Sequence, residues 1–323
     1  MRSEKYSPAP AAVPAGAAVL TVPDACAGLR LDLALARLLP DHSRSRLKGW
    51  IDTGRVRVDG APGVAKRKLA GGERIDVEPA DEPALAADAA QPIALAVVHE
   101  DDAVAVVDKP AGLVVHPGAG RREGTLLNAL LHRYPEVARV PRAGIVHRLD
   151  KDTSGLLVVA RTPAAHTDLV RQLAARTVRR EYIALARGDL AKAVDIDAPI
   201  GRHPDRRTSM AVVARGKPAR THVAPIERYG AATLVRCRLD TGRTHQIRVH
   251  LTAIGHPLLG DPTYGGRHRH PLDSLPALEA FRRQALHAQR LRLVHPASGE
   301  TMRFDAPLPA DFAALLAALR ARS

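Results

Sequence analysis

Cysteine is scarce in this chain: Cys26 and Cys237 are the only two among 323 residues, and they lie far apart. Two distant cysteines exclude a disulfide framework and a CxxC metal pair, and they fit a reducing, cytoplasmic compartment. No uninterrupted apolar run reaches about 18 residues, so we expect no transmembrane helix and no membrane partner. Pro8, Pro10 and Pro14 interrupt the N-terminal segment, which therefore does not resemble a signal peptide.

Acidic and aromatic residues are also in short supply. The sequence holds 34 Asp and Glu against 48 Lys and Arg, a formal charge of +14. Such an excess points to a polyanionic partner, most often a nucleic acid, although an Arg- and Ala-rich genome composition is the alternative. Aromatic residues make up 3% of the chain, so any stacking on bases must use Arg planes and a few selected rings.

Sequence motifs for metals and nucleotide cofactors are missing. The chain has 15 histidines, but no HExxH, CxxC or EF-hand spacing. His245 and His250 are five residues apart, which places them on neither one helix face nor one strand face. No GxxxxGK[ST], GxGxxG or GxSxG motif occurs. We therefore expect no metal and no cofactor.

The length predicts about two domains. Residues 1–16 are rich in Pro and Ala and predict a flexible tail, and residues 17–79 predict a small α/β module. Residues 80–92 are acidic, contain two prolines and predict a linker. Residues 93–323 alternate short apolar runs with scattered helical patterns and show no fixed-period repeat. This mixture predicts an α+β fold with a mixed, mainly antiparallel sheet.

The N-terminal module carries a cluster of cations. Leucines at 31, 35, 38 and 39 predict a helix that Pro40 ends, and Ser43 is placed to cap a second helix. Short strands around residues 56–58 and 74–77 follow. The second helix and its exit carry five basic residues, opposed in that stretch only by Asp52: Arg44, Arg46, Lys48, Arg55 and Arg57. They predict either a nucleic-acid contact surface or an ordinary solvated face.

Residues 93–323 contain clear sequence signals for helices and strands. Thr125 and the pair Thr162-Pro163 are typical of helix N-termini. The amphipathic pattern over residues 311–319 predicts a last helix. Five apolar runs predict strands, at residues 94–98, 103–107, 155–160, 181–186 and 234–239.

A polar loop, GIVHRLDKDTSG at residues 144–155, lies between two apolar runs. Loops fixed between buried strands hold reactive groups rigidly. This one offers Asp150 and Asp152 beside Arg148 and Lys151, and nearby cations favour the charged carboxylate that a nucleophile needs. The spacing alone fits a catalytic loop and a self-satisfied turn equally well.

A second motif, TGRTHQIRVHL at residues 241–251, predicts a helix because Ile247, Leu251 and Ile254 recur at i, i+4 and i+7. His245 and Arg248 would then share a face. Arg248 could pair with Asp150 if the helix lies beside the loop, or it could be a surface arginine.

Tyr182 lies within an alternating strand pattern, REYIAL at residues 180–185. From the residues alone, a half-buried core tyrosine is the simplest interpretation.

Taken together, these segments resemble the RNA pseudouridine synthases of the ribosomal large-subunit type. The helix–ribbon order of residues 17–79 resembles the S4-type RNA-binding domain. The stretches that carry the resemblance to the synthases span nearly all of residues 93–323: GLVVHPGAG, GTLLNALL, PRAGIVHRLDKDTSGLLVVART, REYIALARG, PIGRHP, GKPARTH, TGRTHQIRVHL, GHPLLGDPTYGG, RQALHA and APLP.

The resemblance implies an isomerase that breaks the N1–C1′ bond of a uridine, rotates the uracil and rejoins it through C5 without a cofactor. It implies Asp150 as the essential carboxylate, acting either on the sugar as a nucleophile or on C2′ as a base. Tyr182 would stack on the base, Arg248 would pair with Asp150, and Arg148 would help to displace the base from its stem. Further RNA contacts would come from His147, Arg243, His245 and the cations of the module.

The resemblance further implies 23S ribosomal RNA as the substrate, at the stem-loop named helix 69, in free RNA or in a ribosomal precursor particle. We expect a monomer. The alternatives are a related synthase for another ribosomal or transfer RNA site and an RNA-binding assembly factor without activity. A hydrolase that uses Asp150 and Asp152 is a third alternative.

Overall fold

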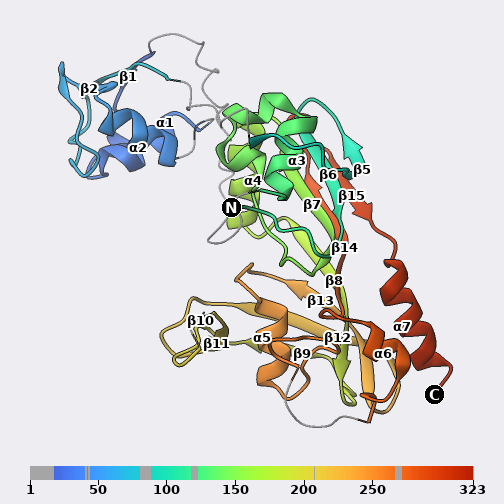
Figure 1. The fold of residues 1–323 in the computed structure, drawn as a ribbon. Helices are drawn as coiled ribbons and strands as arrows, with labels where there is room; N and C mark the ends of the chain where they lie inside the picture. Colours follow the sequence, from blue (N-terminus) through green and yellow to red (C-terminus); the bar gives the residue numbers. More distant parts are fainter. Residues whose placement is uncertain are drawn as a thin grey trace, which may run out of the picture. The chain divides into compact units, whose positions relative to one another are not determined.

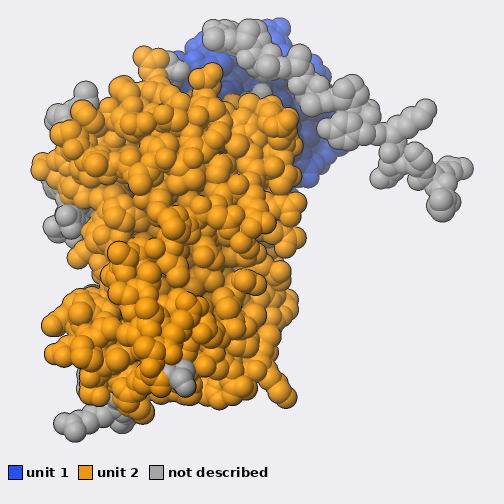
Figure 2. All heavy atoms as spheres, turned by 90° about the vertical axis from the view of Figure 1, so that its right-hand side faces the viewer, with its two compact units in different colours: residues 1–84 blue, residues 85–323 orange. Residues whose placement is uncertain are grey.

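The computed structural model divides the chain into two compact units, residues 1–84 and residues 85–323 (Figure 2). The predicted tail, Ser43 and most of the predicted linker lie outside the residues that it describes. Those residues are 18–40, 42, 44–80, 89–117, 123–206, 208–265 and 271–322.

The first unit is a four-stranded antiparallel sheet with two helices, in the strand order β1-β4-β2-β3. Its helices bury one apolar face each, with Leu31 and Leu35 from α1 and Leu47 and Trp50 from α2 in one core. Both helices predicted for this module are confirmed. The elements are β1 (Ala18–Thr21), α1 (Leu31–Leu38), α2 (Arg44–Asp52), β2 (Val56–Val58), β3 (Ala61–Pro62) and β4 (Arg74–Val77).

The second unit is built on a nine-stranded sheet in the order β5-β6-β7-β14-β8-β13-β12-β9, with β15 paired to β14 (Figure 1). Neighbouring strands are antiparallel except β7 and β14, which are parallel. A separate hairpin joins β10 (Ile200–Arg202) to β11 (Met210–Val212). The strands of the large sheet are β5 (Ala96–Glu100), β6 (Val104–Lys109), β7 (Ser154–Ala160), β8 (Arg179–Arg187), β9 (Val194–Asp197), β12 (Arg220–Arg228), β13 (Ala232–Leu239), β14 (Leu286–Val294) and β15 (Thr301–Asp305).

Helices cover both faces of this sheet. On one face, α3 (Leu126–Arg133) and α5 (Gln246–Ala253) pack on β6, β7, β8 and β13. On the other face, α4 (Pro163–Ala174) packs on β6, β7 and β14, and α7 (Ala310–Arg320) packs with α6 (Pro276–Ala280) on β8 and β13. Every residue of β7 is buried, as the apolar run GLLVVA at residues 155–160 predicts for a central strand.

The local signals in the sequence are confirmed. Thr125 and Thr162 cap α3 and α4 by accepting hydrogen bonds from the third backbone N–H of each helix, and Pro163 is the first residue of α4. The α+β class is confirmed as well. Within the described ranges, none of the helices combines the length and apolar character that a membrane span requires.

Candidate active site

The polar loop before β7 is held in place by a buried lysine. Lys109, at the end of β6, is fully buried and donates from Nζ to the carbonyl oxygens of Pro110, Leu113 and Lys151 at 2.7, 2.9 and 2.9 Å. Lys151 follows Asp150 directly, so the β6 lysine fixes the backbone beside that carboxylate. The sequence analysis did not single out Lys109. The signal that could have identified it is the position of a lysine at the end of an apolar strand.

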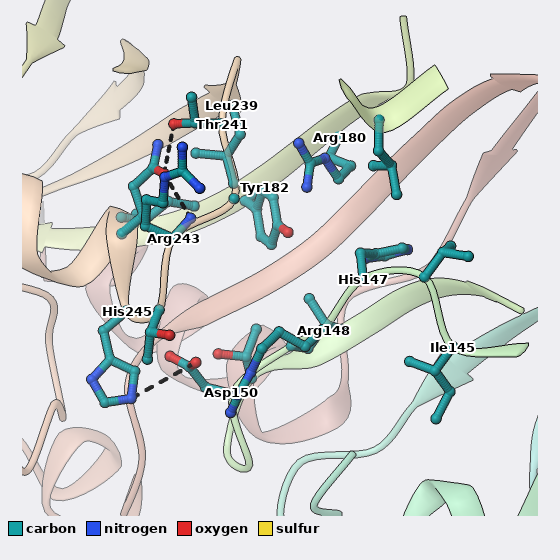
Figure 3. A pocket seen from close by; sticks show the side chains of 18 of the residues that line it. Ile145, His147, Arg148, Asp150, Arg180, Tyr182, Leu239, Thr241, Arg243 and His245 are labelled. Carbon is teal, nitrogen blue, oxygen red and sulfur yellow. Dashed lines mark hydrogen bonds and ion pairs between the residues drawn. The ribbon is translucent and has the colours of Figure 1, made fainter. Parts of the chain in front are cut away.

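Asp150 receives its contacts from α5. Arg248 donates from Nη1 to Asp150 Oδ2 at 3.0 Å, and His245 Nε2 lies 3.8 Å from Asp150 Oδ1. The side chain of Asp150 keeps 15% of its surface exposed, so it is reachable from the pocket (Figure 3). The loop cations Arg148 and Lys151 make no ion pair with it within the described part of the chain. The cation that pairs with Asp150 therefore comes from 98 residues further along the sequence.

Arg248 is buried, which excludes the surface-arginine interpretation. Its Nε and Nη2 donate to the two oxygens of Asp261 at 2.7 and 2.9 Å, and the Asp261 carboxylate is completely buried. Burial disfavours the charged guanidinium, but the hydrogen bonds and charges of Asp261 and Asp150 raise the pKa of Arg248 above its usual value. The guanidinium is thus a permanent cation with a fixed orientation.

Asp261 is a site residue that the sequence analysis missed, although it lies in the quoted stretch GHPLLGDPTYGG. Its Oδ1 also accepts from the backbone N–H groups of Thr263 and Tyr264 at 2.8 and 3.0 Å. The Tyr264 ring lies under the Arg248 guanidinium, with 4.9 Å from Cζ to the ring centroid. The loop after residue 260 therefore supports Arg248 from behind.

His245 precedes α5 in a left-handed backbone conformation with φ 57°, which is unusual for a non-glycine residue. Its Nδ1 lies 2.8 Å from the Tyr264 hydroxyl, and its Nε2 is directed at Asp150 (Figure 3). Burial lowers the pKa of His245, although the Asp150 carboxylate opposes that shift. His245 lies just before α5 and not within it, and both His245 and Arg248 reach Asp150.

Tyr182 reaches the same pocket from β8. Only 5% of the residue is exposed, so it is more buried than the half-buried tyrosine expected from the residues alone. Burial raises the pKa of its phenol, the Arg180 guanidinium lowers it, and the Asp150 carboxylate raises it. The phenol therefore keeps its proton at neutral pH. In the view of Figure 3, Tyr182 lies between Arg180 and Asp150.

The other three predicted site residues of this unit differ in exposure. His147 turns inward and accepts a hydrogen bond from the Val158 backbone N–H at 3.2 Å. Burial, with the charge of Arg180, lowers its pKa to about 3, so the ring is neutral. Arg148 and Arg243 are exposed at the pocket, and Arg243 donates from Nε to the Pro218 carbonyl at 3.1 Å.

These side chains line one pocket of about 930 Å³. Asp150, Tyr182 and Arg248 line it together with several basic residues: Arg142, Arg148, Arg176, Arg180, Arg243 and His245. A volume of this size accepts a nucleotide-sized ligand, and the surrounding cations favour an anionic one.

The predicted cations of the first unit fall into two groups. Arg55 and Arg57 are exposed, and Arg57 donates to the Gly60 carbonyl at 3.2 Å. Arg44 instead pairs with the buried Asp32 of α1 at 2.6 Å. The other two cations of α2 also have partners within this unit. Lys48 pairs with Asp52, and Arg46 donates to the Ala80 carbonyl at 3.2 Å and lies over the Trp50 ring.

Asp32 was not foreseen as an opposing charge, because it lies on the preceding helix.

No described His, Cys, Asp and Glu residues form a group of three or more that could hold a metal ion.

Comparison with known families agrees with this geometry. The model of the RNA pseudouridylate synthase family matches residues 103–253, which contain the candidate residues Asp150, Tyr182 and Arg248. The model of the S4 domain matches residues 29–74 in the first unit.

Curated relatives align along almost the whole chain. The ribosomal large subunit pseudouridine synthase D of Nitrosomonas europaea is 57% identical over 301 residues, covering 93% of this chain and 87% of the relative. The protein of the same name from Pseudomonas aeruginosa is 54% identical over 303 residues, covering 93% and 94%.

Among solved structures, human RNA pseudouridylate synthase domain containing 1 is 30% identical, with a TM-score of 0.53 over 72% of this chain and 96% of that one. Human RNA pseudouridylate synthase domain containing 4 is 26% identical, with a TM-score of 0.55 over 70% and 93%. The chain belongs to the RNA pseudouridylate synthase family and is an enzyme of that class. Its most similar relatives named above are both synthases D of the large ribosomal subunit.

Proposed function

We propose that this enzyme converts uridine to pseudouridine in the 23S RNA of the large ribosomal subunit, at the helix 69 stem-loop, with Asp150 as the reacting carboxylate. The observation that carries the proposal is the pair between Asp150 and the buried Arg248, at 3.0 Å, in a pocket that also contains Tyr182. The names of the relatives support the large-subunit substrate.

The reaction begins with cleavage of the N1–C1′ bond of the target uridine. Asp150 either forms a covalent bond to C1′ as uracil leaves, or removes a proton from C2′. The logic is that of glycosidases, in which a carboxylate stabilises an oxocarbenium-like centre. Arg248 holds the carboxylate in one orientation, because its own position is fixed by Asp261.

The detached uracil then rotates within the pocket and C5 forms the new bond to C1′. In the first route this bond displaces the Asp150 carboxylate from C1′, and in the second the proton that Asp150 removed returns to C2′. The proton on C5 is lost and N1 gains one, so the product is an isomer of the substrate and the equation balances without a co-reactant. Tyr182, buried and neutral, packs on the base and is placed to take part in the proton transfer. Arg148, exposed beside Asp150, takes the place of the target base in its stem.

The RNA around the target uridine is bound by phosphate contacts from exposed cations of both units, including Arg55, Arg57 and Arg243. His147 and His245 complete the wall of the pocket. The substrate is ribosomal RNA or a ribosomal precursor particle in the cytoplasm, and the enzyme acts as a monomer. Elution at the mass of one chain, 34.6 kDa, in light-scattering chromatography checks the last point.

The test compares wild type, Asp150→Asn and Asp152→Asn on 23S RNA, with pseudouridine mapped by carbodiimide-dependent reverse-transcription stops. We expect stops in helix 69 with wild type and Asp152→Asn, and none with Asp150→Asn, whose RNA affinity stays close to that of wild type. Turnover by Asp150→Asn would contradict the assigned role. Reverse-transcription stops only outside helix 69 would indicate that the enzyme modifies another RNA site. The absence of stops with wild type would indicate an RNA-binding factor without activity. Release of free uracil would indicate a hydrolase.

A further inference from the structure

Arg180 is a buried cation in the wall of the pocket. It precedes Tyr182 by two residues in β8, so both side chains project from the same face of the strand. Only 8% of Arg180 is exposed, and the exposed part faces the pocket, on the same side as Tyr182 (Figure 3).

This guanidinium has no partner among the described residues. Its Nε is buried without a hydrogen-bond acceptor, and neither of its other two nitrogens forms a hydrogen bond or an ion pair with a described residue. The two other arginines that are buried in the described ranges behave differently. Arg248 is held by both oxygens of Asp261, and Arg283 by both oxygens of Asp311. Arg180 is therefore a buried charge without the carboxylate that the fold supplies to comparable residues.

Packing against the backbone holds Arg180 in place. A Cβ atom at Gly242 would lie 2.8 Å from Nη1 of Arg180, so the guanidinium lies directly against the chain just before α5. A side chain at residue 242 would push the guanidinium away. The sequence thus provides a buried and positioned cation while leaving its hydrogen-bonding edge free.

A buried charge without a partner is unfavourable, and an anionic ligand removes that penalty. The planar fork of an arginine matches the two non-bridging oxygens of a phosphodiester, which carries the required charge. Uracil oxygens are neutral and do not compensate the cation. The carboxylates lining this pocket are Asp150, already paired with Arg248, and Asp240, which lies 2.9 Å from His222.

We propose that Arg180 binds a phosphodiester group next to the target uridine and so fixes the depth at which the nucleotide enters the pocket. The inference rests on the proposed function, because it assigns a part of the same RNA to the same pocket. Arg180 then acts as a substrate-positioning residue that touches the RNA backbone, and Asp150 and Tyr182 act on the sugar and the base.

The first test uses wild-type enzyme and an RNA fragment that contains the modified uridine. Single methylphosphonate linkages, which are uncharged, replace the phosphates around that uridine one at a time. We expect kcat/KM to fall about 10- to 100-fold for one linkage adjacent to the target uridine. If no adjacent linkage matters, the proposal is overturned. If wild type forms no pseudouridine at all, the proposed function fails first.

The second test combines that neutral linkage with Arg180→Met. Arg180→Met alone should lower kcat/KM on the normal RNA by a similar factor, and the two changes together should cause no further loss. The matched control is Arg176→Met, which removes an exposed arginine of the same pocket, and its smaller loss should multiply with that of the neutral linkage. Multiplying losses for Arg180→Met would reject the contact between Arg180 and this phosphate.

Thermal unfolding separates this role from a structural one. Because Arg180 has no partner in the fold, Arg180→Met should leave the melting temperature unchanged or raise it. Arg283→Met should lower it, since Asp311 loses both hydrogen bonds from that guanidinium. A comparable fall for Arg180→Met would identify Arg180 as a structural residue and overturn the proposal.

Discussion

Arg248 donates to both oxygens of Asp261 and thereby presents its remaining terminal nitrogen to Asp150. The Asp150 carboxylate is thus positioned, through Arg248, by the second carboxylate of Asp261.

Asp261→Asn should reduce kcat about 100-fold with little change in RNA affinity, because Arg248 loses its fixed orientation toward Asp150. The free energy of unfolding should also fall by about 3 kcal/mol, since a buried pair is broken. Single-turnover kinetics and urea denaturation measure the two effects. Asp305→Asn is the control, because that carboxylate pairs with Arg290 and Arg303 outside the pocket. An equal kcat loss in both variants would contradict the role of Asp261.

Lys109→Met should lower the free energy of unfolding by about 3 kcal/mol, because three carbonyl oxygens lose their donor. Activity should fall as well, since the carbonyl of Lys151 anchors the loop that carries Asp150. Lys151→Met is the matched control: its exposed side chain changes while its carbonyl remains in place. Denaturation and single-turnover assays at one pH compare the two, and a larger loss in the control would refute the anchoring role.

Acid should destabilise the protein through its buried histidines. Burial lowers the pKa of His287 from 6.5 to about 4. Between these pH values the imidazole therefore binds a proton in the unfolded chain but not in the folded protein. Stability is therefore full above pH 6.5 and falls as the pH decreases toward 4. His287→Gln should remove about 2 kcal/mol of the loss between pH 7 and pH 5, measured by urea denaturation.

The exposed His132→Gln serves as the control for this pH series and should follow the wild-type curve. An unchanged pH dependence in His287→Gln would show that the buried His287 does not account for the loss of stability in acid.

The cations of the first unit should separate into binding and structural residues. The double change Arg55→Ala and Arg57→Ala should reduce the slope of log affinity against log salt by about 2, with normal stability, if each residue contacts one phosphate. Arg44→Ala should instead lower the melting temperature, because Asp32 is buried and loses one of its two arginines. Filter binding at several salt concentrations and calorimetry test this, and an unchanged slope in the double variant would exclude both phosphate contacts.

Much of the fold follows from local sequence signals. Thr125, Thr162 and Pro163 mark helix starts because capping needs only neighbouring residues. The apolar spacing around Ile247 predicts α5, since one helix face must be buried.

The support of the site could not be predicted in the same way. Asp261 and Lys109 act through contacts that form only in the folded chain, and no periodic pattern in the sequence predicts these contacts. The isolation of Arg180 was even less accessible, because the absence of a partner is a property of the whole pocket wall.

The parallel pairing of β7 with β14 has a consequence for biosynthesis. Ser154 and Gly155 align with His287 and Ala288, and a Cβ at Gly155 would lie 2.3 Å from the Ala288 carbonyl oxygen. The backbone that follows Asp150 therefore gains β14 as its second neighbour only after His287 and Ala288 have been translated. A nascent chain therefore carries Asp150, Tyr182 and Arg248 well before β14 can complete the sheet beside the loop that holds Asp150.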